Sequence, residues 1–283
     1  MSLVLPGSAA FTYCVDNMAG VTPIAATPGT NFTWGGANSE GTTTALLAAT
    51  TRDVHYVVIG IAGVANSGED NSALFDVLAD PAGGSSYGAW ITNLVCGFNP
   101  VNTAGAVGMT CWYHFPLWLP SGSSLACRGQ KAGATGPSTG RCVIYLFGEP
   151  RRPDMWWCGQ AVESLGINNA SSTGTAITPG NTGAWGSWGS IGTSTRRYGA
   201  LQMGLGGSDA TMLAVSYHFQ YGIGSAQMPG TPTLYASCTT TEAMHRINSG
   251  PIFCDVAAST ALQARGTCSG TAENQQVAFY GVY

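Results

Sequence analysis

The chain has 283 residues and a formal net charge of −4; 45% of its residues are hydrophobic and only 8% are charged. This apolar content is enough for a buried core and excludes the class of intrinsically disordered proteins, which combine low hydrophobicity with high charge. Basic residues never exceed two in a row, which excludes the basic stripe of a nucleic-acid-binding protein, and no run of about 18 apolar residues predicts a membrane span. We therefore expect a folded protein with no direct nucleic-acid partner and no membrane insertion.

Apolar residues that alternate with period two predict β-strands along the chain. In chain order, the clearest alternating segments lie at 57–61, 115–119 and 143–147. Clusters of Gly, Pro, Asn and Ser separate such segments about every ten residues, a spacing typical of sandwiches of short antiparallel strands. Two stretches, 45–50 and 160–167, are candidates for single turns of helix. The expected fold class is all-β.

The two halves of the chain repeat one another in the same order. SLACRG at 124–129 aligns with ALQARG at 261–266, which places Arg128 over Arg265. Weaker matches extend the alignment, and they pair 143–148 with 277–281, 53–63 with 196–207, 72–84 with 212–224, 91–97 with 231–237, and 33–37 with 184–188. Such a repeat, with about eight strands in each copy, predicts two tandem antiparallel β-sandwich domains of the jelly-roll type.

The predicted division is an N-terminal arm at 1–27, a first jelly-roll domain at 28–150, a linker at 151–177 and a second jelly-roll domain at 178–283. Trp156, Trp157, Trp185 and Trp188 lie near the junction, and they either fill the seam between the domains or pack in their own sandwich.

Catalytic and metal-binding signatures are weak. GSSYG at 84–88 satisfies the G-x-S-x-G pattern around Ser86, but no helical pattern follows it, as a nucleophile elbow requires. We therefore expect no enzyme, no catalytic residue and no cofactor or metal. The loop at 66–71 is rich in oxygen ligands, and whether its Glu69 and Asp70 bind a cation stays open.

The sequence predicts the orientation of Asp76 and two possible states for Cys127 and Cys142. Asp76 interrupts an apolar strand, and we expect it to face outward because Phe75 and Val77 share the opposite face. Cys127 and Cys142 flank a Gly-rich loop and face each other across the predicted hairpin. They are either two partly buried thiols or a disulfide.

One segment carries a family resemblance. FPLWLPSGSSLACRGQ at 115–130, followed by RCVIYLFG at 141–148, consists of an apolar strand, a Pro-x-Gly turn, a second strand and a closing strand that ends in aromatic-Gly. This pattern resembles the tandem jelly-roll structural proteins of tailed bacteriophages and gene transfer agents. The second half departs from it, since Asp255 stands in the place of Trp118 and Ala257 in that of Pro120.

The resemblance implies a non-enzymatic virion protein, such as a head or tail fibre, a spike or a capsid decoration, in contact with other capsid or tail proteins. A neutral surface rich in Ser, Thr and Asn suits packing against further copies, so we expect a homo-oligomer. Head or tail position, copy number and receptor stay open. The alternative function is a carbohydrate-binding module for host surface polysaccharide. The candidate glycan or subunit contacts are aromatic: Tyr87, Trp90, Trp112, Trp118, Trp185 and Trp188.

Overall fold

The computed structural model describes residues 14–16, 29–63, 71–98, 110–133, 139–148, 157–208, 216–224, 228–229, 234–237, 248–271 and 274–283. Every regular element in these ranges is a β-strand, which confirms the all-β prediction, and none of these residues forms a helix long and apolar enough to cross a membrane. The two expected helical turns were wrong. Their residues form β3 (Thr44–Leu47) and β10 (Val162–Leu165), because pairing with neighbouring strands overrides the weak local preference of short segments.

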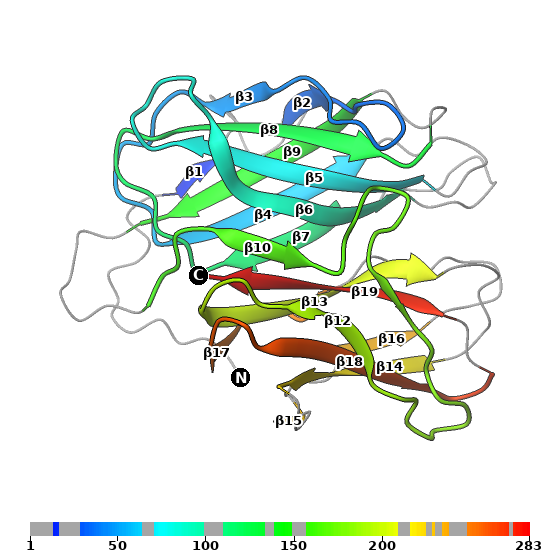
Figure 1. Ribbon diagram of the computed structural model, residues 1–283. Helices are drawn as coiled ribbons and strands as arrows, with labels where there is room; N and C mark the ends of the chain where they lie inside the picture. Colours follow the sequence, from blue (N-terminus) through cyan, green and yellow to red (C-terminus); the bar gives the residue numbers. More distant parts are fainter. Residues whose placement is uncertain are drawn as a thin grey trace.

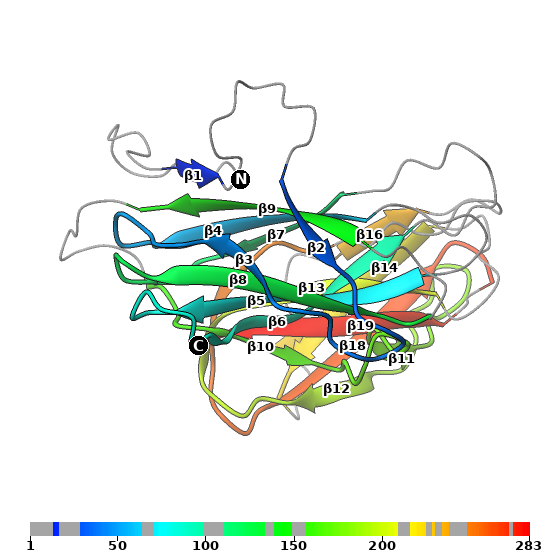
Figure 2. The same cartoon turned by 90° about the horizontal axis from the view of Figure 1, so that it is seen from above.

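The first unit is a sandwich of two sheets. One sheet has the strand order β2-β9-β4-β7, with β1 on the same edge of β9 as β2; the other has the order β3-β8-β5-β6. The new bounds are β1 (Cys14–Asp16), β2 (Thr30–Thr33), β4 (Tyr56–Gly63), β5 (Asn71–Asp80), β6 (Gly88–Phe98), β7 (Thr110–Phe115), β8 (Ser124–Lys131) and β9 (Thr139–Phe147). Figure 2 shows the two layers edge-on. Buried residues of both layers, such as Ile59 and Phe75, belong to one hydrophobic core.

The second unit repeats this strand order. One sheet has the order β12-β18-β14, with β15 and β16 both on β14; the other has the order β17-β13-β19, with β10 and β11 both on β19. The remaining bounds are β11 (Thr175–Ile177), β12 (Gly189–Thr193), β13 (Tyr198–Ser208), β14 (Ser216–Ile223), β15 (Met228–Pro229), β16 (Leu234–Ser237), β17 (Ile252–Val256), β18 (Ala261–Cys268) and β19 (Gln275–Val282). Strands β12, β18, β14 and β16 thus correspond to β3, β8, β5 and β6. Both units have the jelly-roll plan of two interleaved four-stranded sheets.

The two units share a sheet. Nine strands form one sheet that runs from β17 through β13, β19 and β10 into β6, β5, β8 and β3, with β11 also on β19. The junction is a parallel bridge between Val162 of β10 and Ile91 of β6, and Figure 1 shows β10 and β19 between the two sandwiches. The segment 151–177, expected to be a linker, therefore contributes β10 and β11 to the sheets.

Strand β19 is buried on both of its faces. Val277 and Phe279 belong to the core of the second unit, whereas Ala278, Tyr280 and Val282 belong to the core of the first. A strand covered on both sides has apolar residues in succession instead of in alternation, and VAFYGV at 277–282 has this pattern. The two sandwiches are therefore packed against each other through β19.

Two tyrosines complete the seam, where β6 pairs with β10 through the single bridge between Ile91 and Val162 in the described residues. The Tyr280 hydroxyl accepts a hydrogen bond from the Val95 N–H (2.9 Å) and donates one to the Asn93 carbonyl (3.1 Å). The Tyr113 hydroxyl donates to the Val95 carbonyl (2.7 Å), and the two rings pack edge to face at 5.5 Å. These phenols satisfy backbone groups that would otherwise be buried without a partner.

Of the two alternatives for the junction tryptophans, packing within their own unit holds for Trp185 and Trp188. Trp185 and Trp188 contact Arg265 on the sheet of β12, β18 and β14, which takes no part in the junction. Trp157 is 44% exposed and lies over Gly199 of β13. Trp156 lies outside the described residues.

Candidate functional site

Two equivalent loops lie beside the equivalent arginines of the two units. The loops 35–41 and 180–186 each begin and end with glycine. The N–H groups of both glycines donate to one carbonyl, that of Gly129 in the first unit (2.9 and 2.9 Å) and that of Gly266 in the second (3.0 and 2.8 Å). A Cβ on the first glycine of either loop would collide with the loop's own backbone, so this close approach requires glycine.

This geometry corrects one part of the sequence alignment. The pairing of 33–37 with 184–188 was wrong, because it matched the tryptophans and not the glycines that shape the loop. In the structural register Glu40, next to the last glycine of the first loop, corresponds to Trp185. Asp76, opposite Arg128, likewise corresponds to Gln220, opposite Arg265.

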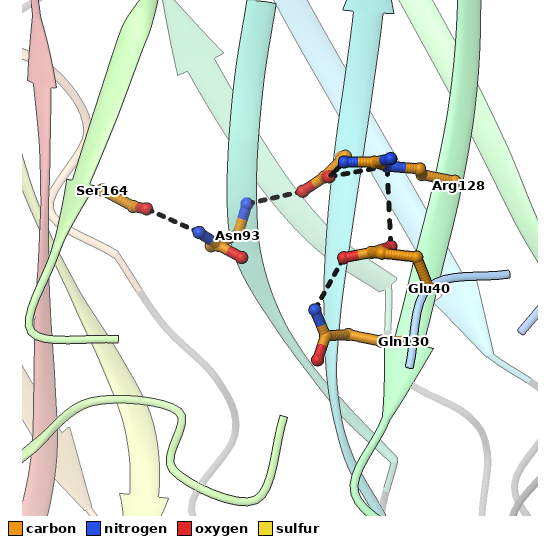
Figure 3. Close-up of polar contacts among 6 residues, drawn as sticks. Glu40, Asn93, Arg128, Gln130 and Ser164 are labelled. Carbon is orange, nitrogen blue, oxygen red and sulfur yellow. Dashed lines mark hydrogen bonds and ion pairs between the residues drawn. The ribbon is translucent and has the colours of Figure 1, made fainter. Parts of the chain in front are cut away.

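In the first unit the arginine is neutralised by carboxylates (Figure 3). The Nε and Nη2 atoms of Arg128 donate to Oδ2 of Asp76 at 3.0 and 2.9 Å, and Oε2 of Glu40 lies 3.6 Å from Nε. Gln130 donates to Glu40 at 2.6 Å. Asp76 lies outside the core that contains Phe75 and Val77, but its side chain is only 4% exposed, because Arg128 and its neighbours enclose the carboxylate.

Hydrogen bonds extend this polar row, which begins with Arg128 and Asp76, through Asn93 to Ser164. The backbone N–H of Asn93 donates to Asp76 Oδ1 (2.8 Å), and the Asn93 side chain donates to Ser164 Oγ on β10 (2.9 Å; Figure 3). Asn93 has a positive φ of 58°, and the register of β5 and β6 shifts beside it. Burial and the Asp76 carboxylate raise the pKa of Glu40, and they outweigh the opposing effects of Gln130 and Arg128. This row is an internally bonded structural cluster.

In the second unit the corresponding arginine has aromatic and neutral neighbours. The Nε and Nη2 atoms of Arg265 donate to Oε1 of Gln220 at 2.9 and 2.8 Å. The guanidinium carbon lies 4.9 Å from the Trp185 ring centre and 4.4 Å from that of Trp188, within the range of cation–π contact. No carboxylate within the described ranges forms an ion pair with Arg265. We call Trp185, Trp188, Gln220 and Arg265 the Trp–Arg patch.

The Trp–Arg patch is accessible to solvent. Trp185 is 41% exposed, and the other three side chains are half-buried. The Trp188 ring lies over Gly222 of β14, where a Cβ would be 2.9 Å from a ring atom, so the glycine lets the indole lie flat on the sheet. The alternation of β14 places His218 on the same outward face as Gln220, while Tyr217 and Phe219 enter the core.

Trp185 and Trp188 were among the sequence candidates for glycan or subunit contacts, whereas Arg265 and Gln220 were not. The alignment of Arg128 with Arg265 was the available signal, because the two arginines have different residues opposite them. That difference becomes visible only when the strand register pairs Arg265 with Gln220.

The other four candidate contacts do not join this patch. Trp90 was wrongly proposed as a surface contact: it is 4% exposed and lies in the core of the first unit. Tyr87 and Trp118 are half-buried in the first unit. Trp112 is 42% exposed on β7, where it stacks on Tyr145 with ring centres 6.3 Å apart.

The structure also describes Ser86 of the G-x-S-x-G pattern and the two cysteines that flank the Gly-rich loop. Ser86 is exposed in the loop between β5 and β6, and its N–H donates to Asp80 (2.9 Å); a strand follows it, not the helix of a nucleophile elbow. Cys127 and Cys142 are buried as thiols. The described ranges hold no cluster of three potential metal ligands, and Glu69 and Asp70 lie outside them.

Comparison with known proteins gives distant structural similarity only. No protein-family model and no curated protein matches the sequence. Among solved structures, PNGase F, a glycosylasparaginase from Flavobacterium meningosepticum, is 11% identical over 95% of this chain and 94% of its own, with a TM-score of 0.41. A chain of Broad Bean Stain Virus is 9% identical over 89% of this chain and 87% of its own (TM-score 0.34).

The tandem CBM22-1-CBM22-2 domain of Paenibacillus barcinonensis Xyn10C is 10% identical over 85% of this chain and 82% of its own (TM-score 0.25). PNGF-II is a longer protein, of which the chain spans 59%. The matched structures thus include virus, carbohydrate-binding and enzyme proteins, and the fold assignment itself rests on the strand order described above.

Proposed function

We propose that this protein is a non-enzymatic structural component of a virion, a bacteriophage fibre, spike or decoration protein that assembles as a homo-oligomer with other capsid or tail proteins. The observation that supports this proposal most is the nine-stranded sheet shared by the two jelly rolls. Together with β19, which packs into both cores, it joins the units into one block with a fixed relative orientation. A load-carrying or lattice-forming protein needs such rigidity.

The composition of the surface supports the same proposal. Only 8% of the residues are charged, so flat sheet faces can pack against one another with few charges to desolvate. The polar cluster around Asp76 is bonded internally, which fits a structural role for these residues.

Two measurements test this proposal together. Mass spectrometry of purified particles should detect the protein at a stoichiometric level, and sedimentation of the isolated protein should give an assembly larger than 29.1 kDa. A monomer that is absent from particles would contradict the proposal. Release of glycans from glycopeptides by the purified protein would replace it with an enzymatic function.

A second candidate function is host adhesion by carbohydrate binding, and the Trp–Arg patch specifically favours it. Sugar-binding surfaces combine flat aromatic faces with hydrogen-bonding groups, and this patch has both on one exposed sheet face. The two functions are compatible, since a fibre or spike can present a binding face to the host surface. Loss of glycan binding in Trp188→Ala, with assembly unchanged, would support adhesion.

A further inference from the structure

We propose that the Trp–Arg patch binds saccharides that carry a carboxylate, such as uronic or sialic acids, and that the first unit has no equivalent site. This inference rests on the adhesion function and names the class of ligand. It follows from the contrast between two arginines that occupy the same position in a repeated fold.

The first step concerns charge. Arg128 is neutralised by Asp76 at 2.9 Å, with Glu40 close by, whereas Arg265 faces Gln220 and Trp185 at the corresponding positions. Because the described carboxylates leave Arg265 unpaired, its positive charge remains available to an anion at the surface. An anionic ligand would supply the partner that Asp76 provides in the first unit.

The second step concerns geometry. Gln220 takes only the Nε–H and one Nη2–H of Arg265, so the remaining N–H groups are left for a ligand. The two indoles and Gln220 hold the planar guanidinium in one orientation, which lowers the entropy lost on binding. A carboxylate matches the fork of guanidinium N–H groups and forms short, charge-assisted hydrogen bonds with it.

The third step concerns the rest of the ligand. Both indoles contact the guanidinium, and Trp185 is 41% exposed. The C–H face of a pyranose packs well against the exposed part of such rings. Gln263 on β18 and His218 on β14 lie on the same outward face.

The experiment compares acidic sugars with their neutral esters. Oligogalacturonate and sialyllactose would each be titrated by calorimetry into the full-length protein, beside the methyl ester of the same sugar. The acid form should bind about tenfold or more tightly than the ester, since only the acid gains the charge-assisted pair. High salt should reduce this difference.

One variant transfers the carboxylate partner of Arg128 to the corresponding position beside Arg265. Gln220→Asp recreates the Asp76–Arg128 pair, which the fold already accommodates, and should lower acid binding to the level of the ester. Arg265→Gln should do the same if Gln220→Asp fails to fold. Matched controls are Trp157→Ala, an exposed tryptophan that lies over Gly199 of β13, and Arg197→Gln, an exposed arginine paired with Asp255. Both controls should bind as the wild type does.

The outcomes separate this inference from the function on which it rests. If acid and ester bind equally and Trp188→Ala abolishes both, adhesion stands and the preference for a carboxylate is wrong. If no sugar binds, both proposals fail. Acid binding that survives both Gln220→Asp and Arg265→Gln would place the anion elsewhere and overturn the assignment.

Discussion

Arg265 occupies the position in the second jelly roll that Arg128 occupies in the first, yet the two guanidinium groups have opposite surroundings. Arg128 donates to the buried carboxylate of Asp76, and Arg265 donates to the amide oxygen of Gln220 and contacts two indoles. One duplicated backbone thus holds an arginine paired with a buried carboxylate and an arginine that has no carboxylate partner within the described residues. This difference separates residues that maintain the fold from those that can bind a partner.

Removal of the Asp76 carboxylate should destabilise the protein. Asp76→Ala leaves Arg128 and the Asn93 N–H without their acceptor. Loss of one partner from a buried ion pair costs about 3–5 kcal/mol, and we expect about 2 kcal/mol here because the Arg128 side chain still reaches water. Urea unfolding followed by tryptophan fluorescence measures this change. The control is Asp255→Ala, which breaks the solvent-exposed pair with Arg197 and should leave the unfolding midpoint almost unchanged.

Replacement of Glu40 by glutamine should stabilise the protein at neutral pH. The folded state raises the pKa of Glu40 above its ordinary value of 4.5, so folding favours the protonated carboxyl and the ionised form costs stability. Glu40→Gln keeps the shape without the charge. Its advantage over the wild type should be present at pH 7 and vanish as the pH falls through the folded pKa to below 4.5. Urea unfolding across this range tests the sign; a growing advantage at low pH would contradict the assigned cause.

Loss of the Tyr280 hydroxyl should weaken the seam between the units. Tyr280→Phe removes the acceptor of the buried Val95 N–H and the donor to the Asn93 carbonyl. An unsatisfied buried backbone group costs about 1–3 kcal/mol, and a loss of this size is expected in the free energy of unfolding. Tyr87→Phe, in a half-buried loop position, serves as the control and should cost less than about 0.5 kcal/mol. Equal losses in both variants would argue against a special role for the seam.

Alkylation should show whether Cys127 and Cys142 are buried thiols or a disulfide. Burial raises the pKa of Cys127 to about 12 and that of Cys142 well above its ordinary value, where the charge of Cys127 also contributes. Because iodoacetamide reacts with the thiolate, neither residue should be modified at pH 8 in the folded protein. Both should react after unfolding in urea, as read by peptide mass spectrometry. A peptide pair that remains linked without reductant would show a disulfide instead.

The repeat and the sandwich class were accessible from the sequence because they depend on local patterns. Val57, Ile59 and Ile61 alternate with period two, and all three are buried on one side of β4, as an antiparallel strand with one core face requires. The alignment of Arg128 with Arg265 agrees with the structure, because the two arginines occupy the same position in the equivalent strands β8 and β18.

Local sequence patterns could not predict the junction of the two units or which residues form the Trp–Arg patch. Which strand β19 packs against on each face, what covers Asp76, and which tryptophans meet Arg265 all depend on residues far apart in the chain. Alternation in a strand reports that one face is buried, but it carries no information about the partner on the other face. That partner is selected by the packing of whole sheets. The seam therefore exists only once both jelly rolls have folded against each other, and the Trp–Arg patch only once the strands of the second jelly roll have paired.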